Sequence, residues 1–265
     1  MVTTVHVPDD ARIRSKLIPT LAEEWDVTYA TRRPGPSDAE GLVWMPLGGS
    51  RLRRWWKASR LMQSKRWDLV AVHDPELLLP AVLRGVSGRP TLFDVHENVP
   101  RQIRTKGWVP VRLRPPLAWL AERLLRVAER RMAITLAEEG YSGLFTRPHP
   151  VLANYLPATL PPVADTTEPP FLAYLGDITE QRGALLALEA AAGAEMGIVM
   201  VGRVSPPELT TSLRRRALQR GVSLELAGPL PHGEALARIG GATAGLAPLL
   251  DIPNYRESLD RKRRI

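Results

Sequence analysis

The 265-residue chain has no cysteine, few aromatic residues and no long apolar run. Without cysteine it can form no disulfide framework, no cysteine-ligated zinc site and no thiol catalyst. Aromatic residues make up 6% of the chain, and its five histidines show no metal-like pair spacing, so we expect no metal site. No apolar stretch approaches the ~20 residues of a membrane-spanning helix. The first ten residues are too short and turn acidic too early for a signal peptide, so we expect a cytoplasmic protein.

The composition is that of a globular protein, with 44% hydrophobic and 24% charged residues. The net charge of +8 resides in the first part of the chain. Residues 1–160 hold 24 basic and 16 acidic residues, whereas residues 161–265 hold 12 of each. A basic first half is suited to binding anionic lipid, nucleic acid or a phosphorylated ligand. A solvated arginine-rich surface explains the same numbers equally well.

Short strand-like apolar runs alternate with longer helical ones, which predicts βαβ units and a parallel sheet. In the first half the predicted strands are residues 2–7, 27–30, 42–45, 69–73, 91–95, 132–136 and 151–153. The clear helices there are residues 11–24, 52–66 and 116–131. In the second half we predict strands at 171–175, 197–201, 223–227 and 243–249, and helices at 183–192, 208–220 and 232–239.

Two Rossmann-like α/β domains are therefore expected, joined by a proline-rich connector. Residues 156–170 contain five prolines among small polar residues, which is typical of a semi-rigid linker. We place the first domain at 1–157, the hinge at 158–170 and the second domain at 171–265. Such folds bind ligands at the carboxyl ends of their strands.

Polar residues follow two predicted strands of the first domain. His73 and Asp74 come after residues 69–73, and Asp74 is placed to cap the following helix, with Pro75 at its first position. His96, Glu97 and Asn98 follow residues 91–95. A histidine at such a place can bind a sugar hydroxyl, a phosphate or a carboxylate, or serve as a satisfied structural histidine.

The second domain contains a strand, a short loop and a helix start at residues 175–183, where Arg182 precedes Gly183. Helix N-termini favour anions, and the guanidinium group of an arginine adds positive charge and paired hydrogen-bond donors, so a diphosphate can bind here. The spacing matches neither a P-loop nor a dinucleotide-binding motif.

Taken in order, the segments of this chain resemble the bacterial glycosyltransferases of family four, which have the GT-B fold. The segments that carry the resemblance are residues 10–21, HDPELLLPA at 73–81, FDVHENVP at 93–100, residues 127–140, VLANYLP at 151–157, LAYLGDITEQRG at 172–183, VGR at 201–203, LAGPLPHGEA at 226–235 and IPNYRESL at 252–259.

The resemblance implies an enzyme of polysaccharide biosynthesis that transfers a sugar from a nucleotide-activated donor to a glycan or lipid-linked acceptor, without a cofactor. It implies that the first domain binds the acceptor and the second the donor. It places His96 at the reacting centre and Arg182 at the diphosphate. Gly202 would face the nucleotide, and Glu257 and Lys262 would contact the donor. The acceptor side would include Glu97, Asn98, His73 and Asp74.

Two departures from the family pattern concern the donor site and the first loop. After Leu259 the chain reads DRKRRI, so Ile265 stands where a second glutamate is expected as the ribose ligand. The glycine pair usual in the first loop is replaced by residues 6–9. We therefore expect a second domain that is incomplete at its C-terminus, and the resemblance leaves open whether the chain is active.

Other readings of the sequence remain open. A sugar-nucleotide epimerase shares the GT-B fold but fits the HDPELL and HEN segments less well. A non-catalytic module that binds nucleic acid or membrane would explain the basic first half. Residues 52–66 combine Leu52, Trp55, Trp56 and Met62 with a basic rim, as an interfacial helix does. Arg101, Arg104, Lys106 and Trp108 can extend that surface, which would place the protein peripherally at the inner membrane face. The simpler alternative is that both tryptophans pack on the sheet of the first domain and the arginines are solvated, as in most amphipathic helices of α/β domains.

Overall fold

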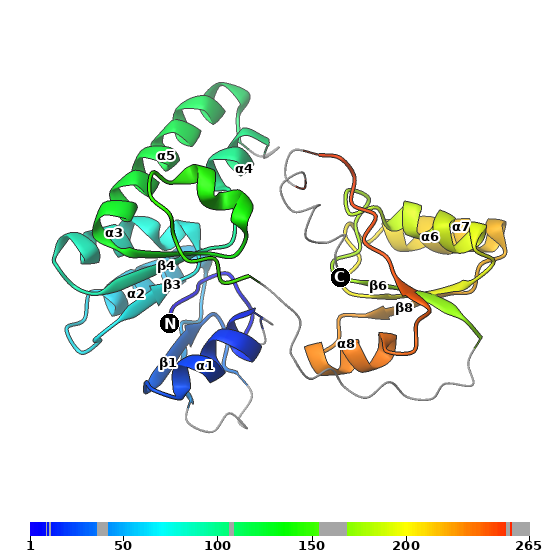
Figure 1. Ribbon diagram of the computed structural model, residues 1–265, viewed down its shortest axis with the longest axis horizontal. Coiled ribbons are helices and arrows are strands. Elements are labelled where there is room, and N and C mark those ends of the chain that lie inside the picture. Colours follow the sequence, from blue (N-terminus) through cyan, green and yellow to red (C-terminus); the bar gives the residue numbers. More distant parts are fainter. Residues whose placement is uncertain are drawn as a thin grey trace. The chain divides into compact units, whose positions relative to one another are not determined.

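The computed structural model describes residues 1–8, 10, 12–35, 42–105, 109–153, 169–252 and 255. The chain divides into two compact units, Met1–Tyr155 and Leu156–Ile265, and each contains its own parallel sheet (Figure 1). The chain is therefore an α/β protein with parallel sheets. The proposed hinge lies almost wholly outside the described residues, so its conformation stays a prediction.

The strands of unit 1 all pair in parallel. β1 (Val27–Thr31) pairs with β2 (Leu42–Pro46), and β4 (Thr91–Val95) pairs with β3 (Val70–Val72) and β5 (Ala133–Leu136). Val2 forms parallel bridges to both Ala30 and Val72 and so connects the two groups of strands. The strand predicted at 2–7 is thus reduced to Val2, because the chain bends after Thr3 toward the carboxylate of Asp74.

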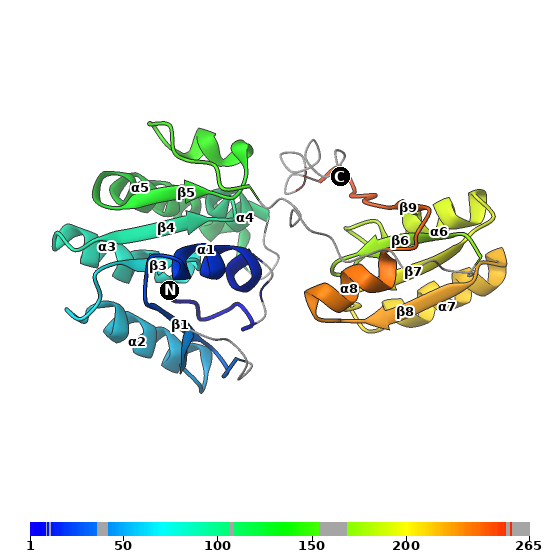
Figure 2. The same cartoon turned by 60° about the horizontal axis from the view of Figure 1, so that its bottom comes forward.

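The helices of unit 1 cover both faces of its sheet (Figure 2). Buried residues of α2 (Arg51–Met62), α3 (Leu78–Val86) and α5 (Arg114–Arg131) form one core with β3, β4 and β5. On the other face, the π-helical segment Ile13–Leu17 and α1 (Ile18–Ala22) pack against β1. The short helix α4 (Val99–Thr105) contacts α5 and was not predicted, because its sequence carries a proline and no clear apolar stripe.

Unit 2 contains a four-stranded parallel sheet in the order β8-β7-β6-β9. Its strands are β6 (Phe171–Leu175), β7 (Gly197–Val201), β8 (Leu224–Gly228) and β9 (Ala244–Gly245). α6 (Ala184–Gly193) and α7 (Leu209–Arg220) pack on one face, and α8 (His232–Ile239) packs on the other. β9 is shorter than the predicted strand at 243–249, although the Leu246 N–H still donates to the Ala173 carbonyl.

None of the helices in the described part of the chain is long and apolar enough to cross a membrane.

Candidate active site

Two histidines and a buried carboxylate meet at the carboxyl ends of adjacent strands in unit 1. His73 directly follows β3, Asp94 lies within β4, and His96 directly follows β4. Because β3 and β4 are parallel neighbours, their carboxyl ends lie at the same edge of the sheet. His73 and Asp94 are each 1% exposed. The adjacency of the His73 and His96 segments is the arrangement that a ligand site at strand ends requires.

Asp94 is the centre of this cluster, although the sequence analysis assigned it no role. Its two carboxylate oxygens accept hydrogen bonds from Arg12, with Nη2–Oδ1 at 2.8 Å and Nε–Oδ2 at 3.1 Å. The Thr135 hydroxyl on β5 donates to Oδ1 at 2.9 Å. Burial by itself would raise the pKa of Asp94, but the His73 imidazole, the Arg12 guanidinium and the neighbouring His96 lower it far below its usual range. Asp94 is therefore a buried anion.

The imidazole rings pack around this anion. The Nδ1 atoms of His73 and His96 lie 3.3 and 3.4 Å from Asp94 Oδ2, and the two rings stack at a centroid distance of 5.4 Å. Within the described residues, none of the ring nitrogens of these two histidines has a hydrogen-bond partner. Burial lowers the pKa of His96 from 6.5 to about 4 despite the charge of Asp94. His96 is therefore a neutral imidazole with hydrogen-bonding capacity to spare.

A third histidine, His6, touches His96 edge-on at a centroid distance of 5.4 Å. Its Nδ1 lies 2.8 Å from Asp10 Oδ2, and its Nε2 lies 3.5 Å from Asp74 Oδ1. Burial alone would lower the pKa of His6, but the hydrogen bond to Asp10 and the nearby carboxylates raise it above 6.5. His6 also lowers the pKa of Asp10 to about 2, although burial opposes that shift. The motif HVPD, read only as a departure from a glycine pair, thus places a histidine with a raised pKa beside His96.

Asp74 does not cap a helix with its side chain, so that interpretation was wrong. Pro75–Leu77 is a short 3₁₀ helix without a side-chain cap. The carboxylate instead accepts hydrogen bonds from Thr3 Oγ1 at 2.9 Å, from Thr4 Oγ1 at 3.0 Å and from the Val5 N–H at 3.2 Å. It therefore holds the N-terminal loop, and with it His6, against the site.

Glu97 and Asn98 follow His96 at the start of α4. Glu97 is exposed, whereas the Asn98 Oδ1 accepts a hydrogen bond from the Arg101 N–H at 3.1 Å. Asn98 therefore caps α4, a structural role that the sequence analysis did not assign. The Tyr141 hydroxyl donates to the His96 carbonyl at 2.7 Å and fixes the backbone at this turn. The acceptor roles of Glu97 and Asn98 stay predictions.

His73, Asp94 and His96 also offer three ligand atoms that lie within 4.8 Å of one another, so they could hold a small divalent ion. The positive charge of Arg12 already balances Asp94, and both carboxylate oxygens accept hydrogen bonds from it. A second cation at the same carboxylate would be repelled by that guanidinium. The donor set therefore fits a metal ion poorly.

In unit 2, glycines end three neighbouring strands at their carboxyl edge: Gly176 after β6, Gly202 after β7 and Gly228 in β8. Gly176 and Gly202 have φ values of +130° and +150°. A Cβ on Gly202 would lie 1.9 Å from the Gly176 carbonyl oxygen, so the two loops approach as closely as backbones can. Because these three residues carry no side chain, the backbone at this edge of the sheet is open to a ligand.

Arg182 lies directly before α6, beside the same edge. Its Nη1 lies 3.2 Å from the position that a Cβ on Gly176 would occupy. Its backbone is held by Thr179 Oγ1, which accepts from the Arg182 N–H at 3.1 Å, and by the Tyr174 hydroxyl, which donates to its carbonyl at 3.3 Å. Among the described residues the Arg182 guanidinium has no ion-pair partner. Glu257 and Lys262, the other two predicted donor ligands, lie outside the described residues.

No protein-family model matches the sequence, and no curated protein sequence matches it. Solved structures do match. The chain is similar to WaaG, a glycosyltransferase involved in lipopolysaccharide biosynthesis, with a TM-score of 0.61 and 12% identity over 94% of this chain and 75% of that one. It is similar to AviGT4, a glycosyltransferase involved in avilamycin A biosynthesis, with a TM-score of 0.58, 16% identity and 91% of this chain covered.

A third similar structure is the lipopolysaccharide outer core galactosyltransferase WaaB, with a TM-score of 0.50, 13% identity, and 92% and 73% of the two chains covered. This chain spans only 62% of the length of AviGT4. At these identities the similarity establishes architecture rather than substrate. The chain therefore has the GT-B fold of these glycosyltransferases, over most of its own length and part of theirs.

Proposed function

We propose that the chain is a glycosyltransferase that moves a sugar from a nucleotide-activated donor to a glycan or lipid-linked acceptor. The observation that carries the proposal is His96, a neutral imidazole at a strand end, held beside a buried anion and without a hydrogen-bond partner among the described residues. Buried polar groups normally find partners. A sugar hydroxyl is one that such an imidazole can bind as donor or acceptor.

The GT-B fold supports this assignment, since the known structures that share it here are glycosyltransferases. In the proposed division of roles, unit 1 binds the acceptor and contributes His96, with His73 and Asp74 holding the surrounding cluster. Unit 2 binds the donor. We propose that the helix start at α6 and the Arg182 guanidinium hold the diphosphate, and that the backbone at Gly202 faces the nucleotide. Glu257 and Lys262 remain proposed donor contacts.

Calorimetry with UDP and GDP tests the donor site through an Arg182→Ala variant. We expect its affinity to fall about 10- to 100-fold, the scale of a charge-assisted hydrogen bond of roughly 1.5–3 kcal/mol. Arg203→Ala is the matched control, because Arg203 is a nearby arginine whose side chain is 73% exposed and makes only a 3.7 Å ion pair with Asp177. Equal affinities of the Arg182 variant and the parent would remove Arg182 from the site.

Turnover with a panel of nucleotide sugars tests the role of His96. We expect His96→Ala to lower the transfer rate at least ~100-fold, in the range of acid–base and hydrogen-bond catalysis, with nucleoside diphosphate affinity unchanged. His149→Ala is the control, because His149 is also largely buried but pairs with Glu129, away from this cluster. A His96 variant with full turnover would refute the catalytic role.

We further propose that unit 1 contacts an anionic membrane surface, which a lipid-linked acceptor would require. The surface predicted on α2 is smaller than expected, because Met62 is buried in the core and Trp55 donates from Nε1 to the Glu76 carbonyl at 2.8 Å. Leu52 and Trp56 remain, at 67% and 64% exposure. Lys106 and Trp108 lie outside the described residues.

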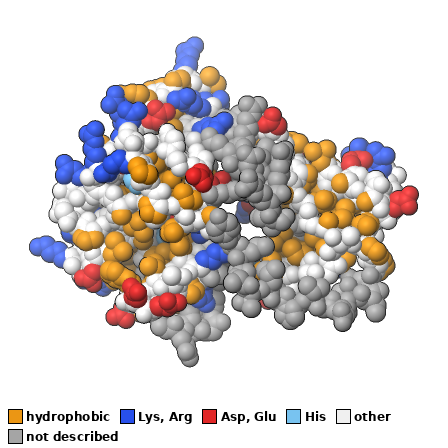
Figure 3. All heavy atoms as spheres, in the orientation of Figure 1, with side chains coloured by type: hydrophobic (Ala, Val, Ile, Leu, Met, Phe, Trp, Pro, Cys, Tyr) orange, Lys and Arg blue, Asp and Glu red, His pale blue; other side chains and the backbone are white. Residues whose placement is uncertain are grey.

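A larger apolar stripe lies on α5 and the turn before it. Leu113, Leu117, Leu120 and Val127 follow helical spacing, and each is at least 41% exposed. Trp119 lies beside them at 55% exposure. Figure 3 shows Lys and Arg side chains gathered over this part of unit 1. An exposed apolar stripe with a basic surround is typical of an interfacial helix.

A further inference from the structure

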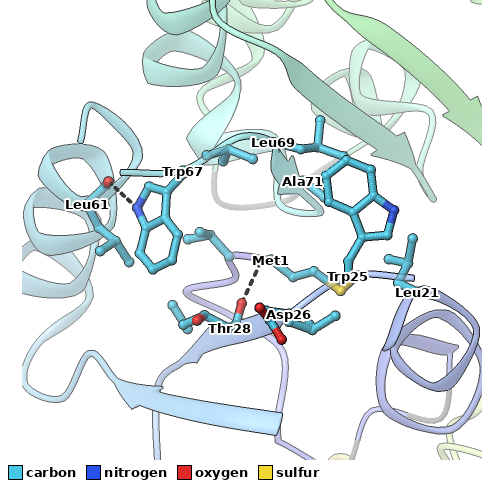
Figure 4. A pocket seen from close by; sticks show the side chains of 13 residues that line it. Met1, Leu21, Trp25, Asp26, Thr28, Leu61, Trp67, Leu69 and Ala71 are labelled. Carbon is cyan, nitrogen blue, oxygen red and sulfur yellow. Dashed lines mark hydrogen bonds between the residues drawn. The ribbon is translucent and has the colours of Figure 1, made fainter. Parts of the chain in front are cut away.

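The two ends of the unit 1 strands differ in their chemistry. At the amino-terminal end, a cavity of about 80 Å³ has a largely apolar lining (Figure 4). Among the described residues this lining includes Trp25, Leu61 and Trp67 but no histidine. At the carboxyl end lie the three histidines of the candidate site, and the proposed function gives no role to one of them, His6. A group that exchanges protons with a substrate is therefore to be sought at the carboxyl end.

His6 forms a histidine–carboxylate pair with Asp10. The His6 Nδ1 lies 2.8 Å from Asp10 Oδ2, and the two side chains are 30% and 24% exposed. The carboxylate is itself oriented, because its Oδ1 accepts hydrogen bonds from the Arg12 and Ile13 N–H groups, each at 3.1 Å. A carboxylate at one ring nitrogen fixes the tautomer and the orientation of an imidazole. In the neutral ring, Nδ1 then carries the hydrogen and Nε2 carries the lone pair.

The Nε2 atom of His6 is available to a substrate. It makes no hydrogen bond among the described residues, and Asp74 Oδ1 lies 3.5 Å from it. The Asp74 carboxylate already accepts hydrogen bonds from Thr3 Oγ1, Thr4 Oγ1 and the Val5 N–H. Since a carboxylate has only about four acceptor positions, little capacity is left for His6. Asp74 therefore acts on His6 through its charge, which stabilises the protonated ring, while Nε2 stays open to a hydroxyl.

His6 also lies beside the imidazole that the proposed function places at the reacting centre. The rings of His6 and His96 touch edge to face at a centroid distance of 5.4 Å, so a ligand bound to His96 lies next to His6. Three carboxylates, on Asp10, Asp74 and Glu97, raise the pKa of His6 above 6.5, although burial opposes them. A general base is most efficient when its pKa lies near the working pH.

We propose that His6, oriented by Asp10, is the general base that takes the proton of the acceptor hydroxyl. This inference rests on the proposed function. As Nε2 takes the proton, the hydroxyl oxygen forms a bond to the anomeric carbon of the donor sugar. The bond from that carbon to the diphosphate oxygen breaks, and the nucleoside diphosphate leaves with the electron pair. The imidazolium, stabilised by Asp10 and Asp74, then releases its proton to solvent.

The pH dependence of donor turnover tests this role. The measurement is the release of nucleoside diphosphate from UDP-glucose, UDP-galactose, UDP-N-acetylglucosamine and GDP-mannose, with water as the acceptor, between about pH 5 and 9. We expect the rate of the parent to rise with pH through the pKa of His6 and then to level off. His6→Ala should lose this rise and be at least ~100-fold slower on the plateau, with unchanged affinity for the nucleoside diphosphate. Asp10→Asn should move the rise to lower pH, because it removes a carboxylate that raises the pKa of His6.

Added imidazole distinguishes a base from a structural residue. It can occupy the space that His6→Ala leaves and replace the missing base, so we expect it to accelerate this variant at least about tenfold and to leave the parent unchanged. His149→Ala is the matched control, because His149 also pairs with a carboxylate, Glu129 Oε1 at 3.2 Å, away from the candidate site. The control should keep the rate and the pH profile of the parent.

The possible results separate this inference from the proposed function. A His6→Ala variant with the rate and the pH profile of the parent would overturn the role of His6 and leave the proposed function in place. A slow His6→Ala variant that imidazole does not accelerate would also overturn it, because a structural role then accounts for the loss. A parent that releases no nucleoside diphosphate from any of the four donors would overturn the proposed function, and this inference with it.

Discussion

At the scale of single residues, two touching imidazoles have pKa values that are shifted in opposite directions. Burial lowers the pKa of His96 to about 4, whereas Asp10 and Asp74 raise that of His6 above 6.5 against the effect of burial. We therefore expect NMR titration of the ring protons to give a midpoint near pH 4 for His96 and above pH 6.5 for His6. Asp10→Asn should lower the His6 midpoint. A single shared midpoint near pH 6.5 would contradict this arrangement of charges.

The same shifts determine how stability depends on pH. Between pH 6.5 and 4 the unfolded chain binds a proton at His96 that the folded chain does not, so this group lowers stability as pH falls through that window. His6 acts in the opposite direction. Its contribution is complete below pH 6.5 and is lost as pH rises through its raised pKa. Because the pKa of His96 is about 4, its imidazole should stay neutral between pH 5 and 7, which is the form that the proposed catalysis uses.

The pair of Arg12 and Asp94 should be the most sensitive contact of the site. Both side chains are buried, and removing one partner leaves an unpaired buried charge. We expect Arg12→Met to lower the free energy of unfolding by about 3–5 kcal/mol in urea denaturation. Arg51→Met is the control, since Arg51 is 70% exposed in its pair with Glu76 and should cost less than about 1 kcal/mol. Equal losses would show that burial does not decide the strength of these pairs.

At the scale of elements, two glycines that end strands of unit 2 allow the cost of a positive φ to be measured apart from the cost of a steric clash. Gly202 and Gly228 both have positive φ, but a Cβ on Gly202 meets the Gly176 carbonyl at 1.9 Å, whereas a Cβ on Gly228 meets nothing within 4 Å. Gly228→Ala should therefore cost about 1–2 kcal/mol of stability from φ alone. Gly202→Ala should cost clearly more, because the Gly176 loop must move as well. Thermal unfolding measures both losses of stability. Equal losses in the two variants would contradict the close approach of Gly202 to Gly176.

Apolar strands were the most predictable elements. The runs at 91–95, 171–175 and 197–201 coincide with β4, β6 and β7, because buried parallel strands are nearly continuous apolar segments bounded by breakers. Elements that depend on tertiary contacts were not predictable. α4 is defined by its Asn98 cap and its packing on α5, and the N-terminal strand is limited to Val2 by the hydrogen bonds from Thr3 and Thr4 to Asp74.

The residues of the candidate site likewise divide into those that the sequence predicted and those that it did not. His73 and His96 were found because polar residues at strand exits stand out against apolar strands. Arg12 and Thr135 were missed, because their contacts with Asp94 join residues 82 and 41 positions apart. A charge inside the apolar segment at residues 93–95 was the available signal, since a buried carboxylate needs a partner somewhere in the chain. Sequence identifies the need for such a partner but not its identity.

At the scale of the whole molecule, the question is which surface of the basic first half meets a bilayer. Residues 1–160 carry all of the net charge of +8, and each basic residue near an anionic leaflet contributes about 1 kcal/mol. The α5 stripe presents more exposed apolar side chains than Leu52 and Trp56 on α2. We therefore expect α5 to dominate membrane contact, with electrostatics making the binding reversible and dependent on salt.

Co-sedimentation with vesicles of stated composition tests this ranking. The parent should bind vesicles containing anionic lipid at low salt and be released at high salt. A Trp119→Ala, Leu120→Ala double variant should weaken binding about tenfold or more, because each side chain forfeits roughly 1–2 kcal/mol of apolar burial. The matched variant Leu52→Ala, Trp56→Ala should weaken it less. A larger loss in the α2 variant would reverse the ranking of the two helices. A parent that stays in the supernatant with anionic vesicles at low salt would make both helices ordinary surface helices, and the acceptor would then have to reach the site from solution.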